Sequence, residues 1–200
     1  MNFDFAEKIN YELEKLNFEN AITIAKKHLN EINQTSFHKI LEHSFTNNVE
    51  DCIKWIDSFY RKISKNSEIK AFYFELNEFD INTEKWYIQC FAFEFDGGYN
   101  PEDMEWLSDC NPEIMTKEEF VLTGLEDFQN LFENFENLIE NDDVSQELQD
   151  ARDWTEQIII SKFMQFIHQV HLTAKNNNLE WANIAFYFTE HEYDFIVQSK

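Results

Sequence analysis

Apolar residues recur with a period of about 3.6 through the first 65 residues, which is the spacing that places side chains on one face of an α-helix. Residues 49–63 carry the clearest stripe, and Asn47 and Glu50 stand at its start with the spacing of a capping box. Three shorter stripes predict further helices at 6–16, 21–32 and 37–44. The N-terminal third of the chain is therefore predicted to be helical.

The period then changes to 2, and aromatic and β-branched residues take over. IKAFYFEL (69–76) and KWYIQCFAFEF (85–95) predict two antiparallel strands joined by a loop of several residues. Near the middle of the second strand, apolar side chains point to both faces. Such a strand either lies in a sheet covered on both sides or leaves one face open for binding.

Turn residues end the second strand at 96–101, and an acidic segment follows. We expect helix to return after Pro112, because Thr116 and Glu119 have capping spacing and residues 128–139 form an amphipathic stripe. The longest helix is predicted at 144–175.

The strand sequence AFYFELNEFD (71–80) recurs as AFYFTEHEYD (185–194), with six of ten positions identical. Each copy follows the end of a predicted helix, so we interpret the repeat as one structural solution used twice. The small alanine allows close helix approach, and the two phenylalanines share one face of the strand. Duplication of a helix-plus-hairpin unit is the alternative.

Together these elements predict a single α+β domain over residues 1–200. In it, the N-terminal helices and a long helix of the C-terminal half pack on a small, mainly antiparallel sheet of about four strands. Hydrophobic residues make up 43% of the chain, with 21 Phe but only three Gly and two Pro, a composition typical of a chain that folds. Its three cysteines have no metal-ligand or disulfide-framework spacing, so we expect free thiols.

Charge is the unusual bulk property. The chain has 39 acidic and 16 basic residues, and residues 101–150 hold sixteen of the acids with Lys117 as the only base. We expect these acids to share one contiguous outer surface. Such a surface repels nucleic acid and anionic lipid and attracts a basic protein, although acidity can also serve solubility alone. The N-terminus lacks the pattern of a signal peptide, and no apolar run is long enough for a membrane span, so we expect a cytoplasmic protein.

Catalytic signatures are weak. His191 lies among Glu190, Glu192 and Asp194, a set that could form a general base or a metal site, but polar residues also collect in a turn between strands, which is the interpretation we favour. His168 and His171 have a spacing of i, i+3 on the long predicted helix, without a carboxylate at ligand spacing.

Several common sites are missing from the sequence. It contains no nucleophile elbow, no P-loop, no dinucleotide fingerprint and no EF-hand spacing among its acids. We therefore expect no catalytic residue, no metal and no cofactor. The residues that best fit a partner-binding site are aromatic side chains surrounded by one sign of charge: Tyr99, Glu102, Asp103, Glu105, Trp106 and Asp109. The alternative for Trp106 is that it starts the next helix and packs into the core.

The aromatic strand-and-turn segments AFYF, FAFEFDGGY and AFYFTEHEYD, together with the acidity, make the chain resemble the immunity proteins that protect bacteria from their own polymorphic toxins. This resemblance implies stoichiometric binding to a basic toxin domain, with no catalysis. Two other functions stay open. One is an enzyme or small-ligand-binding protein with an aromatic pocket between sheet and helix near His191. The other is a scaffold that binds through an exposed sheet face.

Overall fold

The computed structural model describes residues 3–77, 85–111, 114–140, 144–191 and 195–200. The α-helices are α1 (Phe3–Glu14), α2 (Phe18–Asn30), α3 (Val49–Ile63), α4 (Glu126–Glu140) and α5 (Gln146–Asn176). Two short 3-10 helices are η1 (Ser36–Leu41) and η2 (Glu105–Ser108). The strands are β1 (Ala71–Asn77), β2 (Tyr87–Phe93), β3 (Phe120–Val121), β4 (Ala185–Glu190) and β5 (Val197–Ser199). No helix within the described ranges has a stretch long and apolar enough to cross a lipid bilayer.

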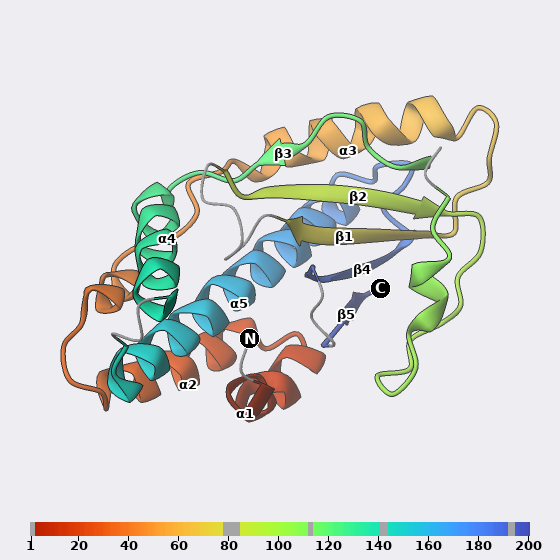
Figure 1. Ribbon diagram of the computed structural model, residues 1–200. Helices are drawn as coiled ribbons and strands as arrows, with labels where there is room; N and C mark the ends of the chain where they lie inside the picture. Colours follow the sequence, from red (N-terminus) through yellow and green to blue (C-terminus); the bar gives the residue numbers. More distant parts are fainter. Residues whose placement is uncertain (1–2, 78–84, 112–113, 141–143, 192–194) are drawn as a thin grey trace.

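The strands form one sheet in the order β3-β2-β1-β4-β5 (Figure 1). β1 and β2 pair in antiparallel fashion, as predicted, and so do β2 with β3 and β4 with β5. β1 and β4 are parallel. The predicted α+β class is confirmed, with a mixed sheet of five strands where about four were expected. The additional strand, β3, has only two residues, which leaves little sequence signal to detect.

The two AFYF segments lie side by side in β1 and β4. Ala71 pairs with Ala185, and the register continues without a break to Leu76 opposite Glu190. Each residue of one copy therefore points to the same sheet face as its counterpart, so the two strands meet the same packing requirements. Phe72 and Phe186 illustrate this, because the rings of this register pair contact each other with their centroids 5.7 Å apart.

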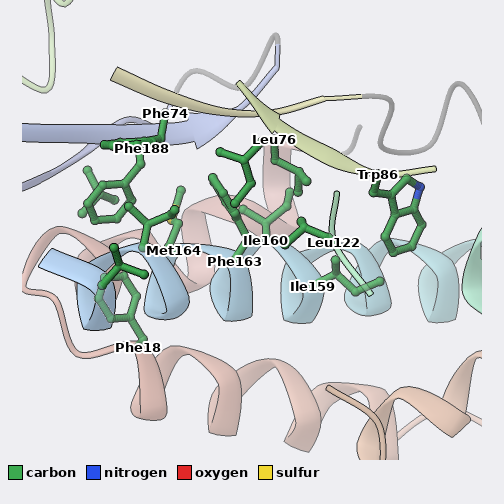
Figure 2. Close-up of a cluster of buried hydrophobic side chains, with 14 of the residues drawn as sticks. Phe18, Phe74, Leu76, Trp86, Leu122, Ile159, Ile160, Phe163, Met164 and Phe188 are labelled. Carbon is green, nitrogen blue, oxygen red and sulfur yellow. The ribbon is translucent and has the colours of Figure 1, made fainter. Parts of the chain in front are cut away.

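Helix α5 lies in the middle of the molecule, between the sheet and α2 (Figures 1 and 2). Residues 151–164 of this helix are all buried, so it has no solvent face along this stretch. Figure 2 shows sheet side chains directed at α5, and α3 covers the same sheet face through the contact of Phe59 with Phe72. The prediction of a long helix at 144–175 is confirmed within about two residues.

Charged groups are buried along α5 as well. Arg152 donates to Glu156 at 2.5 Å and to Asp153 at 3.3 Å, and all three side chains are buried. Further along α5, after Glu156, the ammonium of Lys162 donates to the backbone carbonyls of Ile40 and His43. These contacts fix the end of η1 against α5, because backbone acceptors at a helix end need a partner when buried.

The second face of the sheet is covered by the chain that follows β2. A smaller apolar cluster forms there, separate from the main core, around Phe93, Leu107 and Tyr187. Both faces of the central strands are therefore packed, and this part of the aromatic sheet does not form the open face that a sheet-binding scaffold would need.

Two local predictions are wrong. Asn48, and not Asn47, caps α3 by accepting the N–H of Glu50, because the side chain of Asn47 is bonded to the backbone of Thr123 instead. The segment around Thr116 is not helical: its hydroxyl accepts the N–H of Cys90, and its own N–H donates to the carbonyl of that residue. Pairing with β2 satisfies this backbone, so the capping spacing has no effect there.

Candidate functional site

The acidic segment leaves β2 through a turn that is bonded to the sheet. Gly98 has a φ of 82°, and its N–H donates to Oδ1 of Asp96 at 2.9 Å. The hydroxyl of Tyr187 in β4 donates to the same oxygen at 2.5 Å. Burial tends to raise the pKa of Asp96, but the hydrogen bonds from Tyr187 and Gly98 and the charge of Lys200 outweigh it and lower this pKa. The turn is thus fixed by an ionised carboxylate.

Trp106 lies in η2 and packs on the second sheet face. Its ring contacts Tyr187 at 5.0 Å, Phe93 at 5.3 Å and Phe95 at 5.4 Å between centroids. The indole N–H donates to the carbonyl of Gly98 at 3.1 Å. Trp106 is therefore held in one orientation while part of its surface stays accessible, and it does not begin a helix that enters the main core.

Tyr99 is also half-buried. Its hydroxyl donates to the backbone carbonyl of Ile196 at 3.1 Å, which joins the acidic segment to the chain just before β5. Burial, with a contribution from the charge of Glu14, raises the pKa of Tyr99 to about 12, so the phenol keeps its proton at neutral pH. The hydrogen bond of Tyr99 thus holds the acidic segment against the chain that leads into β5.

The four acidic residues of the predicted site are exposed around η2. Asp103, Glu105 and Asp109 line, together with Trp106, an open hollow of about 500 Å³. Glu102 lies on the turn just before. We call the predicted set the η2 surface: Tyr99, Glu102, Asp103, Glu105, Trp106 and Asp109. Within the described residues, no group of three or more His, Cys, Asp and Glu side chains is close enough to hold a metal ion.

The carboxylates of the η2 surface, like Asp127, Glu133 and Glu136 of α4, are not neutralised by bases of the described residues, and the η2 surface adds a fixed aromatic ring to them. Elsewhere carboxylates pair with bases of the same chain, for example Asp51 with Lys54 and Asp57 with Arg61, each at 2.7 Å. None of the four η2 carboxylates forms an ion pair with a lysine or arginine of the described ranges, and the residues outside those ranges contain neither.

The acids of residues 101–150 do not form one contiguous surface, contrary to expectation. The segment around η2 and helix α4 lie at opposite ends of the sheet (Figure 1). The chain between them runs back along β2, from the bond of Thr116 with Cys90 to the bond of Leu122 with Trp86. Sequence neighbours are separated in this way because an extended chain spans about 3.3 Å per residue. The docking hypothesis can therefore rest only on the η2 end.

A second cavity lies beside the first, between the sheet and the segment that carries η2. Its volume is about 420 Å³, and residues far apart in the sequence line it: Tyr73, Glu75, Phe91, Leu107, Cys110 and His191. Tyr73 and Phe91 stack with ring centroids 5.9 Å apart and form an aromatic wall. The cavity agrees with the expected aromatic pocket near His191, although η2 and not a long helix forms its second side.

Glu75 is the polar centre of this cavity. It accepts the hydroxyl of Tyr73 at 3.0 Å through Oε1, and Nδ1 of His191 lies 3.3 Å from Oε2. The side chain of Glu75 is 14% exposed, whereas that of His191 is 48% exposed and stands at the rim. Burial and the charge of Glu75 raise the pKa of Tyr73 well above its usual value, so Tyr73 remains a hydrogen-bond donor.

β4 delivers His191 to this position. Because β1 and β4 pair in parallel, with Glu75 opposite Thr189, the residue two places further reaches the end of β1. The N–H of His191 donates to the carbonyl of Leu76 at 3.0 Å. The neighbours Glu192 and Asp194, which we also considered, lie outside the described residues.

His168 and His171 come together at Ser199. Their Nδ1 atoms lie 2.9 and 2.8 Å from its hydroxyl oxygen, and Nε2 of His171 donates to the carbonyl of Ala182 at 3.0 Å. These contacts attach β5 to α5. The pair thus has a structural role in the packing of the C-terminus.

Sequence reasoning missed Tyr73, Glu75 and Cys110 as pocket residues. A signal did exist for Glu75, since a carboxylate inside an aromatic strand must find partners or remain partly solvated.

Comparison with family models, with curated proteins and with solved structures finds no match to this chain.

Proposed function

We propose that this chain is a non-catalytic, acidic protein-binding module whose η2 surface docks a basic protein, as an immunity protein docks the toxin domain that it neutralises. The observation that carries the proposal is the set of exposed carboxylates without counter-ions around an aromatic ring held in place. Surface charge of one sign speeds the encounter with an oppositely charged partner, and a fixed tryptophan supplies buried area at little entropic cost.

The test compares two variants with equal change in charge. In the first, Glu102→Gln, Glu105→Gln and Asp109→Asn remove three charges from the η2 surface. In the second, Glu133→Gln, Glu136→Gln and Asp127→Asn remove three exposed charges from α4 at the opposite end. None of these six side chains has a described hydrogen bond or ion pair, so folding should be preserved.

The immobilised wild-type protein is used to capture basic proteins from an extract of its source cells, and affinities are then measured with the purified partner. Exposed charge pairs contribute about 0.2–1 kcal/mol each, so the loss of three should make the η2 variant bind about 3- to 150-fold more weakly than the α4 variant. Affinity should also fall as salt rises from about 0.1 to about 1 M, where the Debye length falls from about 10 to about 3 Å. Equal binding by both variants, binding indifferent to salt, or capture of no basic protein contradicts the proposal.

The cavity at Glu75 favours a second function, the binding of a small organic ligand. Its volume falls in the range of ligand pockets, and it combines a mainly apolar lining with a few convergent polar groups. This function is independent of protein docking, because Glu75 lies beneath the acidic segment and not on the η2 surface.

A further inference from the structure

The cavity at Glu75 has the chemistry of a site for a positively charged group. Apolar side chains, among them Phe91, Leu107 and Ile196, form most of its wall, and Glu75 is the one carboxylate among the described residues that line it. No lysine or arginine lines it within the described residues, and the remaining residues of the chain contain neither. A carboxylate in such surroundings interacts strongly with a cation, because little water screens it.

Glu75 has capacity for another donor. A carboxylate offers about four lone-pair positions, and the contacts with Tyr73 and His191 use one on each oxygen. Tyr73 points its hydroxyl at Oε1, so it orients the carboxylate and adds no positive charge. The stacked rings of Tyr73 and Phe91 line the same space, and aromatic faces attract cations.

His191 is the group that could neutralise Glu75 from within the protein. Its ring is about half exposed and stands at the rim, where Nδ1 lies 3.3 Å from Oε2. A neutral imidazole that donates from Nδ1 leaves the net charge of the carboxylate intact. Apart from Glu75 and His191, the described residues that line the cavity are apolar or uncharged polar.

We propose that this cavity binds a small organic ammonium ion, with the charged nitrogen at Glu75 and an aromatic or aliphatic body against Phe91 and Leu107. The proposed ligand class rests on the second function above, the binding of a small ligand. It is independent of whether a protein docks at the η2 surface.

The experiment uses three probes of one shape that differ in charge: benzylamine, which is cationic at neutral pH, benzyl alcohol, which is neutral, and benzoate, which is anionic. Each is titrated into the full-length protein and followed by NMR chemical shifts. A charge-assisted hydrogen bond to a largely buried carboxylate should make benzylamine bind about tenfold or more tightly than benzyl alcohol. Benzoate should not bind.

Cys110 supplies a second readout inside the pocket. It is the cysteine with partial exposure, whereas Cys52 and Cys90 are buried and burial raises the pKa of both of their thiols. Iodoacetamide should therefore modify Cys110 first. Bound benzylamine should slow this reaction in proportion to the occupancy measured by NMR.

Two variants test whether the carboxylate of Glu75 is the charge that attracts benzylamine. Glu75→Gln keeps an acceptor for Tyr73 but removes the charge, so benzylamine should then bind no more tightly than benzyl alcohol. Glu136→Gln removes an equal charge from the exposed face of α4, far from the cavity, and the preference for benzylamine should persist. Unchanged binding of benzyl alcohol shows that a variant retains the cavity.

The outcomes distinguish two claims: that the cavity binds a small ligand, and that this ligand is a cation. If none of the three probes binds, ligand binding at this cavity is wrong. If benzyl alcohol binds as tightly as benzylamine, or if Glu75→Gln keeps the preference, the cavity is a ligand site but the cationic class is wrong. Preference for benzylamine that depends on Glu75 and protects Cys110 supports the proposal.

Discussion

Trp106 lies directly over Gly97, and a single added methyl group tests this contact. A Cβ atom at residue 97 would stand 2.5–2.7 Å from three atoms of the Trp106 ring. Carbon atoms in contact are normally about 3.5–4.0 Å apart, so Gly97→Ala must push the ring outward by about 1 Å. The contacts with Tyr187 and Phe93 and the bond to the carbonyl of Gly98 oppose that movement.

The expected cost follows from these contacts. Overpacking typically costs about 1–3 kcal/mol, and a weakened hydrogen bond adds about 0.5–1.5 kcal/mol. The lower entropy of the unfolded alanine chain offsets about 0.4–1 kcal/mol. We expect Gly97→Ala to lower the free energy of unfolding by roughly 1–3 kcal/mol, which for a chain of this size is a fall in Tm of about 2–4 °C per kcal/mol.

Gly98→Ala is the matched control. A Cβ atom at residue 98 would meet nothing within 4 Å, but its φ of 82° is unfavourable for alanine. The cost should be about 1–2 kcal/mol, entirely from the backbone. The two variants thus lose similar stability for different reasons, and only Gly97→Ala should disturb Trp106.

Urea denaturation measures both free energies, and the indole N–H signals in a proton-nitrogen NMR spectrum report the ring. The Trp106 signal is assigned by its loss in Trp106→Phe. Gly97→Ala should shift this signal and leave the other four tryptophan signals in place, whereas Gly98→Ala should affect it much less. A Trp106 signal unmoved in Gly97→Ala, together with unchanged stability, refutes the packing of η2 on the turn and with it the fixed geometry of the η2 surface.

Two further predictions concern groups buried along α5. Burial, assisted by the charge of Lys175, lowers the pKa of His171 from 6.5 to about 4, so the unfolded chain takes up a proton first and stability is lost as pH falls from about 6.5 towards 4. Between pH 7 and pH 5 the wild type should lose about 1–2 kcal/mol more than His171→Gln in urea denaturation, and parallel losses would contradict this. Arg152→Leu should cost about 3–5 kcal/mol, because Asp153 and Glu156 stay buried without their guanidinium partner. Replacing Glu156 by leucine as well should recover part of the loss, and no recovery would show that the ion pair is not the cause.

The sequence predicted the long elements well. Stripes of apolar residues at helical spacing located α3 and α5, and aromatic alternation located β1 and β2, because amphipathic periodicity records which face of an element is buried. It failed for β3 and for the segment around Thr116, where bonds to β2 decide the conformation. A capping residue works only if its neighbours adopt helical dihedral angles, and a long-range backbone partner can prevent this.

Some residues of the candidate sites could likewise be predicted from the sequence, and others could not. Tyr99, Trp106 and their acidic neighbours are close in sequence, so a local pattern could identify them. Glu75 and His191 are far apart in the chain and meet only because β1 and β4 are neighbours in parallel register. The sequence of one strand does not reveal which strand lies beside it, since any strand offers the same backbone donors and acceptors.

What the sequence by itself determined is the kind of each long element, which of its faces is buried, and a large negative charge. Only the tertiary structure decided where that charge lies, by sending residues 114–122 back along β2 and so separating α4 from η2. It also created the pocket at Glu75. Local periodicity reflects short-range contacts within one element, whereas surfaces and cavities depend on which elements come together, and that choice is made by the packing of the whole chain.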